Sequence, residues 1–396
     1  MKTGIHLKQV LANFDLDGHG IIGEISDDTL LHRHTIARLY HNTRSTVSLK
    51  VIGEVCDWLI SHNVPADILP GALFGAEASN LWHAAAKAGI VSIYLGEFQQ
   101  VQDNAHIPWI SRQDAALLNA LVEEFSTSGV CGASKPKLAP QYVPFRVDES
   151  AQLSDRAEVK AEHTAAVNTY RKICRNLKAS SAILIGSQRI NRLVEAFVAD
   201  LFDCQPFVAD SRLLVPFYLA YQSRIRPVES CFGGLRNPPG RKGTFQPGIH
   251  YLDSSDEWDC IPWVEHKQDS GVVITSHEPG TGELMLAIFG LRGRATETLG
   301  KFVIKNPDKF WTAEVEKQGK KIGVYICKIT YPPKGSIKPG EPDRAQDVQV
   351  IPLDETILTK YLKGKSTTTN PAKAAAKTLK SIVKHLPLPG SGNGVS

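Results

Sequence analysis

The chain has 396 residues, more than one hydrophobic core of ordinary size holds, which predicts two or three domains. Hydrophobic residues make up 42% of it and charged residues 22%, which excludes a disordered or fibrous protein. The net charge is +4, but the seven lysines after Glu355 contribute +7, so residues 1–355 carry about −3. This balance excludes a protein that binds nucleic acid over a uniformly basic surface, so any contact with DNA must be local.

The seven cysteines are dispersed, and none has a partner at the spacing of a zinc site. Scattered cysteines without a signal peptide predict a reducing, cytoplasmic location. No apolar run approaches the roughly 18 residues that cross a bilayer, so we expect no membrane contact. The sequence indicates neither a metal site nor a cofactor.

Residues 1–75 are predicted to form an all-α domain of five short helices. Apolar residues recur at helical spacing in four segments, and a short stretch with a glycine exit closes the unit. The segments are 5–14, 21–29, 31–42, 47–62 and 63–75. Ser48 is the expected N-cap of the fourth helix, because its hydroxyl can accept a free backbone N–H of the first turn.

The segment "LHRHTIARLYHN" (31–42) combines histidines and arginines with Ile36 and Leu39 on an inward-facing stripe. With the "VSLKVIGEVCDWLISHNVPADILPG" that follows, it resembles the second half of a Cro/C1-type (XRE-like) helix-turn-helix domain. The resemblance lies within residues 1–75. It implies a bacterial transcriptional regulator that binds double-stranded DNA as a homodimer, with the third helix in the major groove.

The resemblance also implies which side chains contact DNA. At the start of the third helix and one turn further, side chains can read base edges: His32, Arg33, His34, Thr35 and Arg38. In the loop behind, phosphates can be held by His41, Asn42 and Arg44. The alternative is a solvated basic helix whose histidines cap or cover a small core.

After residue 75, strand and helix patterns alternate, which predicts an α/β architecture. Residues 76–150 are expected to form an α/β subdomain and a linker, and residues 151–360 a Rossmann-like α/β sensor or effector domain. Residues 361–396 are expected to be a basic flexible tail, either solvated or attracted to the DNA backbone. The predicted fold class is therefore α+β and multidomain, with an all-α helix-turn-helix domain before the Rossmann-like domain.

Two strand-turn-helix segments are candidates for a ligand site. An apolar strand over 182–185 precedes one glycine turn, and a core strand over 285–289 precedes another. Free N–H groups at helix N-termini favour anions, and ligands collect at the carboxyl ends of strands. The candidate ligand-binding residues are Gly186, Ser187, Arg189, Asn191, Gly290, Gly293, Arg294 and Thr296.

The pattern of these two turns resembles α/β modules attached to bacterial helix-turn-helix and winged-helix regulators. We therefore expect the domain to sense a small anionic or nucleotide-like ligand. The alternative is a pair of ordinary turns that bind nothing. The glycine- and proline-rich segment 226–259 between them is expected to be an exposed loop, with a lid over the ligand as the alternative.

A nucleotide-processing enzyme or effector is the second functional class, and the sequence names no catalytic residue for it. Ser187, Cys231 and His277 are eligible by residue type for nucleophilic catalysis, but none lies in a nucleophile-elbow motif. Cleavage of a nucleotide would instead need a carboxylate near the ligand. The acids considered for that role are Glu195, Glu229 and Glu283.

Overall fold

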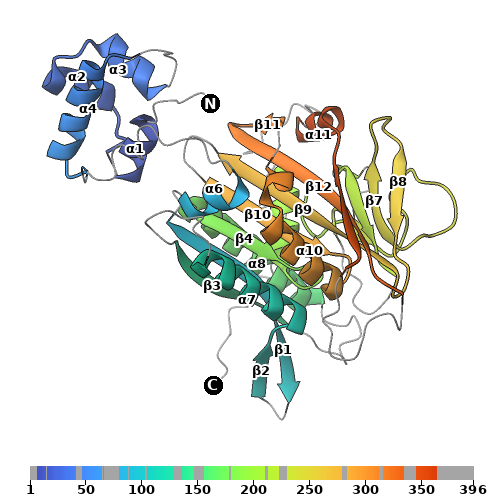
Figure 1. Cartoon of the computed structure of the whole chain (residues 1–396). Coiled ribbons are helices and arrows are strands. Elements are labelled where there is room, and N and C mark those ends of the chain that lie inside the picture. Colours follow the sequence, from blue (N-terminus) through green and yellow to red (C-terminus); the bar gives the residue numbers. More distant parts are fainter. Residues whose placement is uncertain are drawn as a thin grey trace, which may run out of the picture.

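The structure is a computed structural model. It describes residues 7–14, 16–41, 47–64, 66, 80–87, 89–102, 105–127, 136–146, 156–177, 180–209, 213–222, 230–278, 283–311, 315–333 and 345–363. Figure 1 shows an N-terminal group of short helices and a larger part built on a twisted sheet. The coarse prediction, a helical N-terminal region followed by an α/β region, is therefore confirmed.

The N-terminal lobe contains four helices among the described residues: α1 (Leu7–Asn13), α2 (Ile21–Thr29), α3 (Arg33–Tyr40) and α4 (Leu49–Ser61). Their apolar faces meet in one small core around Ile25, Ile36 and Leu59. The Ser48 hydroxyl accepts the N–H of Val51 at 3.4 Å, which confirms the predicted N-cap of α4. The fifth predicted helix lies almost entirely outside the described residues.

The larger part contains a nine-stranded sheet in the described portion of the chain. Its strands are β1 (Ile90–Gln102), β2 (Ala105–Trp109), β3 (Lys137–Arg146), β4 (Ser181–Ile185), β9 (Gln268–Glu278), β10 (Glu283–Gly290), β11 (Val315–Lys317), β12 (Lys320–Thr330) and β13 (Asp347–Pro352). The main order is β11-β12-β9-β10-β4-β1-β2, and β3 and β13 pair with β1 and β12.

The sheet is mixed. Strands β3, β1, β4 and β10 run parallel to one another, whereas β9, β12 and β13 pair antiparallel. Strands β1 and β3 come from the segment 76–150, and they lie in the same sheet as β4 and β10. The segment 76–150, expected to be a separate subdomain and linker, thus contributes strands to the same sheet as the domain that follows it.

A second, four-stranded sheet consists of β5 (Phe217–Ala220), β6 (Gly233–Gly234), β7 (Gly248–Leu252) and β8 (Trp258–Pro262). The segment 226–259 was expected to be an exposed loop, but its described part supplies β6, β7 and the start of β8. His250 on β7 is fully buried, and its Nε2 lies 2.9 Å from the carbonyl oxygen of Gln246. The glycines and prolines here separate short strands, which explains why the pattern resembled a loop.

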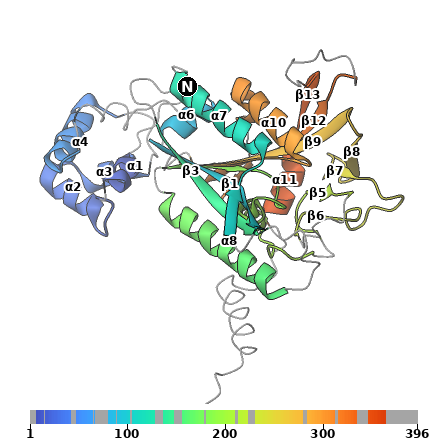
Figure 2. The ribbon, with the colours of Figure 1, turned by 90° about the horizontal axis from the view of Figure 1, so that it is seen from below.

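Helices cover both faces of the large sheet, as Figure 2 shows. One face carries α6 (Leu81–Lys87), α7 (Arg112–Thr127), α10 (Gly293–Lys305) and the 3-10 helix η2 (Pro307–Phe310). The other face carries α8 (Arg156–Asn176), α9 (Arg192–Leu201), α11 (Glu355–Leu362) and the small sheet. The large sheet therefore separates two hydrophobic cores.

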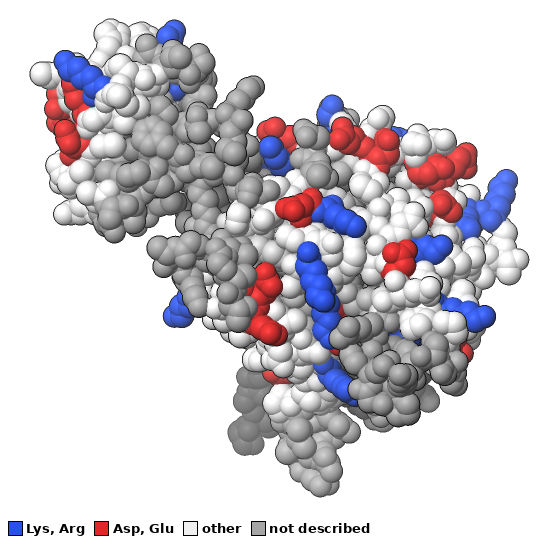
Figure 3. All heavy atoms as spheres, viewed as in Figure 1, with Lys and Arg blue, Asp and Glu red and all other residues white. Residues whose placement is uncertain are grey.

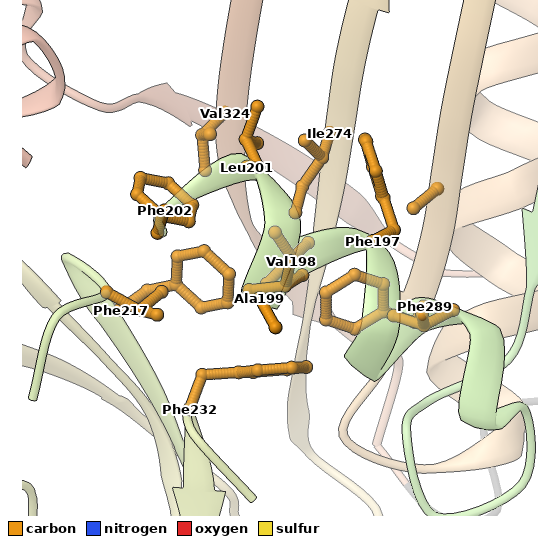
Figure 4. Close-up of a cluster of buried hydrophobic side chains, with 14 of the residues drawn as sticks. Phe197, Val198, Ala199, Leu201, Phe202, Phe217, Phe232, Ile274, Phe289 and Val324 are labelled. Carbon is orange, nitrogen blue, oxygen red and sulfur yellow. The ribbon is translucent and has the colours of Figure 1, made fainter. Parts of the chain in front are cut away.

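Aromatic residues join α9 to both sheets. In Figure 4, side chains of α9 meet Phe217, Phe232 and Phe289. The ring of Phe232 lies 5.4 Å from that of Phe217 and 6.0 Å from that of Phe289, between centroids. This packing fixes α9, and so fixes the turn that leads from β4 into it.

Gly96 on β1 allows the β4–α9 turn to lie directly against β1. A Cβ atom at this position would overlap the backbone and side chain of Ile190. We therefore predict that Gly96→Ala lowers the free energy of unfolding by ~1–3 kcal/mol, because the backbone of Ile190 cannot easily move aside. Thermal unfolding followed by circular dichroism measures this change.

Gly53 on α4 provides the matched control, since a Cβ there would meet nothing within 4 Å. Gly53→Ala should be neutral or stabilise the lobe by up to ~1 kcal/mol, because alanine favours a helix. Equal effects of the two substitutions would contradict the proposed packing of the turn on β1.

Candidate functional site

The β4–α9 turn is held to β1 by the side chain of Asn191. Its Oδ1 accepts the N–H of Leu193 at 3.1 Å and caps α9. Its Nδ2 donates to the carbonyl oxygens of Tyr94 and Ile185, both at 3.0 Å. Gly186 has a φ of 98°, a conformation that favours glycine. Asn191 and Gly186 thus have clear structural tasks in the turn where a ligand was expected.

The β10–α10 turn is held together by Thr296. Its Oγ1 accepts the N–H of Gly290 at 2.9 Å, and a Cβ at Gly290 would overlap Ala295 and Thr296. No side chain caps the N-terminus of α10, whose N-cap residue is Arg292. Of the residues predicted here, Gly290 and Thr296 shape the turn, while Gly293 and Arg294 lie in the first turn of the uncapped helix.

The two predicted turns are neighbours in space. Ile185 of β4 pairs with Ile288 of β10, and the Gly186 N–H donates to the Ile288 carbonyl at 3.1 Å. The helices that follow, α9 and α10, pack on opposite faces of the sheet. In open α/β sheets, this arrangement of adjacent parallel strands marks the edge at which ligands bind. The sequence prediction therefore names residues that do lie together.

Three arginines leave these turns, and each lies over an aromatic ring. The distances from the guanidinium carbon to the ring centroid are 4.7 Å for Arg189 on Tyr221, 3.8 Å for Arg292 on Trp263 and 3.5 Å for Arg294 on Tyr331. Burial lowers the pKa of Arg189; Tyr221 acts in the opposite direction, and the charge of Arg292 adds to the lowering. Guanidinium groups bind phosphate and carboxylate groups, so three of them around these turns favour an anion. The sequence predicts Arg189 and Arg294 as ligand-binding residues, but not Arg292.

One buried polar side chain belongs to the β4–α9 turn, and another lies beside it. Gln188 is fully buried, and its amide group faces the Tyr221 hydroxyl without meeting it at good hydrogen-bonding geometry. Asp114, at the start of α7, is 1% exposed, and its Oδ2 also has no hydrogen-bond partner. A Cβ at Gly186 would lie 3.9 Å from that oxygen. Leaving such a group unsatisfied costs ~1–3 kcal/mol, so its retention calls for a functional explanation.

Neither Gln188 nor Asp114 stood out in the sequence. Asp114 follows a serine N-cap in an ordinary helix start, and the Ser111 hydroxyl accepts its N–H at 3.0 Å. Burial raises the pKa of the Asp114 carboxyl. Only the packing of α7 against the two turns places this carboxyl at the same edge of the sheet.

A second buried acid, Asp269, lies at this edge as the second residue of β9. It is 3% exposed, and its Oδ1 accepts the N–H of Ser270 at 2.8 Å. Burial raises the pKa of Asp269 to about 7, although the Ser270 N–H, Arg292 and Arg294 act in the opposite direction. A carboxyl that titrates near neutral pH, close to two arginines, is suited to move a proton.

The carboxylates considered in the sequence lie elsewhere. Glu195 is fully buried on α9, where it accepts hydrogen bonds from the Phe207 N–H at 2.9 Å, the Cys231 N–H at 2.7 Å and the Ser230 hydroxyl at 2.6 Å. The Glu195 carboxylate thus holds the segment at Phe207 and the segment at Ser230 and Cys231 in place. Glu283 begins β10, at the opposite end from the turn. Glu229 lies outside the described residues.

The residues considered for nucleophilic catalysis are separated. Ser187 follows the carboxyl end of β4, whereas His277 pairs with Leu284, which pairs with Ser181 at the start of β4. Ser181 and Ser187 are six residues apart along the chain, which corresponds to roughly 20 Å of extended strand between Ser187 and His277. Burial raises the pKa of Cys231, which keeps it in the unreactive thiol form.

The side chains predicted to read DNA lie on the surface of α3. His32, Arg33, His34 and Arg38 are exposed, and Thr35 is half-buried. The inward positions hold Ile36 and Leu39, at 0% and 2% exposure. His32 caps the helix, since its Nδ1 accepts the His34 N–H at 3.2 Å, and the two rings stack with centroids 5.2 Å apart.

Helix α3 follows α2 after a turn of three residues, in which Leu30 has a left-handed φ of 58°. His41 is exposed at the end of α3. Asn42 and Arg44, predicted to hold phosphates, lie outside the described residues. The helix therefore presents its basic groups outward.

No protein-family model, curated protein or solved structure matches the chain. Among the described residues, no helix has both the length and the hydropathy to cross a membrane. Two groups of residues are therefore the candidates for function. One is the exposed basic surface of α3. The other is the edge of the sheet that carries Arg189, Arg292 and Arg294, called the arginine edge below.

The raised pKa of Asp269 predicts a pH dependence of stability. The unfolded chain has an aspartate pKa near 3.9, so the folded protein holds this proton more tightly and loses stability as the pH rises from about 4 to about 7. Asp269→Asn removes this loss and keeps an acceptor for the Ser270 N–H. We expect the stability of D269N relative to the native protein to rise by up to ~4 kcal/mol between pH 4 and pH 8.

Urea unfolding across this pH range measures the difference. Asp347→Asn, at an exposed position on β13, is the matched control and should follow the native protein. A constant difference between D269N and the native protein at all pH values would show that Asp269 does not titrate near neutrality.

Proposed function

We propose that this protein is a regulator that binds double-stranded DNA through α3 and responds to a small anionic or nucleotide-like ligand at the arginine edge of its sheet. The observation that carries the DNA-binding half is the division of α3 into an exposed basic surface and a buried apolar stripe. Eight residues of helix are about 12 Å long, which suits a major groove about 12 Å wide.

The charge distribution supports a local DNA contact. In Figure 3, both acidic and basic side chains lie on the visible described face of the larger part, with a narrow row of basic side chains near its centre. Helix α2 carries exposed acids, Glu24, Asp27 and Asp28, which repel phosphates. These acids favour an approach to DNA through α3 alone. Since one such helix contacts only a few base pairs, we propose a homodimer on a two-part site.

The ligand half of the proposal rests on the three arginines and the buried polar groups between the two turns. Arg189, Arg292 and Arg294 supply positive charge where α10 also offers an uncapped N-terminus. Helix N-termini and guanidinium groups both favour phosphate. Asp114 and Gln188 add buried hydrogen-bonding groups that a hydroxyl or amino group of a nucleotide would satisfy.

An enzyme that processes a nucleotide is the second candidate. Asp269 favours it, because a carboxyl with a pKa of about 7 can act as a general base at neutral pH. The two candidates differ in one outcome, since an enzyme consumes the nucleotide and a sensor returns it unchanged.

Replacement of both arginines on α3 tests DNA binding. Duplexes selected from a random pool by the full chain serve as the probe. We expect Arg33→Ala with Arg38→Ala to lower the affinity for these duplexes by at least ~30-fold, because each arginine–base contact contributes about 1–3 kcal/mol. Fluorescence anisotropy at fixed salt measures the affinity.

The control for this double variant is Lys50→Ala, which removes an exposed cation on α4 whose side chain is 85% exposed. It should lower binding only slightly. Failure of the native chain to select any duplex, or unchanged binding by the double variant, would refute the role of α3.

Replacement of Arg189 tests the ligand site. With ATP, ADP, pyrophosphate and phosphate as probes, at least one should raise the melting temperature of the native protein, because a ligand held by the folded state stabilises it. Arg189→Gln should abolish that rise, while Arg171→Gln, at an exposed position on α8, should leave it intact. Analysis of the probe after incubation separates a sensor from an enzyme. No stabilisation by any probe would count against the site.

A further inference from the structure

The N-terminal lobe brings together three side chains that ligate metals. Among the residues that the structure describes, Glu24, Asp28 and His62 each offer one ligand atom, and these atoms all lie within 4.8 Å of one another. Glu24 and Asp28 are four residues apart, on one face of α2. His62 directly follows α4. The packing of α2 against α4, visible in Figure 1, therefore assembles a mixed set of one imidazole and two carboxylates.

The imidazole of His62 is held in one orientation. Its ring stacks on that of Trp58, with centroids 3.8 Å apart, and its Nδ1 lies 2.9 Å from the Trp58 carbonyl oxygen. The Ser61 hydroxyl lies 3.1 Å from the same nitrogen and donates to the same carbonyl at 2.7 Å, so a proton on Nδ1 satisfies both contacts. The lone pair is then on Nε2, as a metal ligand requires.

The same tryptophan orients Asp28. The indole Nε1 of Trp58 donates to Asp28 Oδ2 at 2.9 Å, and Trp58 itself is only 4% exposed. Zinc-binding histidines usually donate a hydrogen bond from their other ring nitrogen to a carbonyl or carboxylate, and zinc-binding carboxylates are usually hydrogen-bonded as well. Both features are present here. One rigid, buried side chain thus fixes two of the three ligands before an ion arrives.

We propose that Glu24, Asp28 and His62 form a binding site for a divalent transition-metal ion, with Zn²⁺ as the ion that the donor set favours. Imidazole with carboxylates suits zinc, whereas Mg²⁺ and Ca²⁺ prefer oxygen ligands alone. Three protein ligands leave a further coordination position for water. The bound ion joins α2 to the end of α4 and stabilises the lobe that carries α3. This site depends neither on DNA binding nor on the arginine edge.

Titration of the full chain with Zn²⁺ in a calorimeter tests the proposal. We expect one site whose affinity falls at least about tenfold in Glu24→Gln and in His62→Gln. Trp58→Phe keeps an aromatic ring but removes the donor to Asp28, and it should also weaken binding by about tenfold. Asp27→Asn and His41→Gln alter exposed residues outside the set and should bind zinc as the native chain does.

Fluorescence provides a second measurement that needs no substitution in the ligand set. Because His62 stacks on Trp58, Cu²⁺ at the site should quench the emission of Trp58, and excess Zn²⁺ should reverse the quenching. Trp58→Phe should lack the quenched component. Native affinity in both E24Q and H62Q, or copper quenching that Zn²⁺ does not reverse, would overturn the proposal.

Discussion

The larger part of this protein depends on the parallel pairing of β4 with β10. That pairing brings two turns together although their strands are about a hundred residues apart, and the Gly186 N–H locks the turns through the Ile288 carbonyl. Asn191 then ties the β4 turn to β1, and Thr296 closes the β10 turn. These internal bonds hold both turns, and the side chains around them, together with the uncapped N-terminus of α10, form the candidate site. The arginines and the buried acids are therefore its chemically informative residues.

These charged groups impose opposing electrostatic demands. Three guanidinium groups at one edge repel one another, and stacking on Tyr221, Trp263 and Tyr331 offsets part of that cost. Asp269 is buried beside two of them, yet burial outweighs their attraction and keeps its pKa near neutrality. Such a balance is sensitive to an added anion, since a bound phosphate would change the protonation of nearby acids.

The N-terminal lobe separates its charges by helix. Basic groups occupy the exposed side of α3, while α2 carries acids that meet His62 from α4. Trp58 links these features, because it belongs to the small core and also bonds Asp28 and contacts His62. An ion bound to the acids of α2 would reduce their repulsion of DNA phosphates. The proposed metal site and the proposed DNA surface are thus compatible within one lobe.

Local patterns in the sequence determined much of this protein. Apolar spacing predicted α2, α3 and α4, Ser48 predicted an N-cap, and the apolar runs before Gly186 and Gly290 predicted β4 and β10, because each signal depends on residues within a few positions. Only the tertiary structure decided that β1 and β3 join the same sheet, that segment 226–259 forms strands, and that Asp114, Gln188 and Asp269 are buried at the same edge. Strand pairing and burial arise between residues far apart in the chain, and no local pattern records which partners they choose.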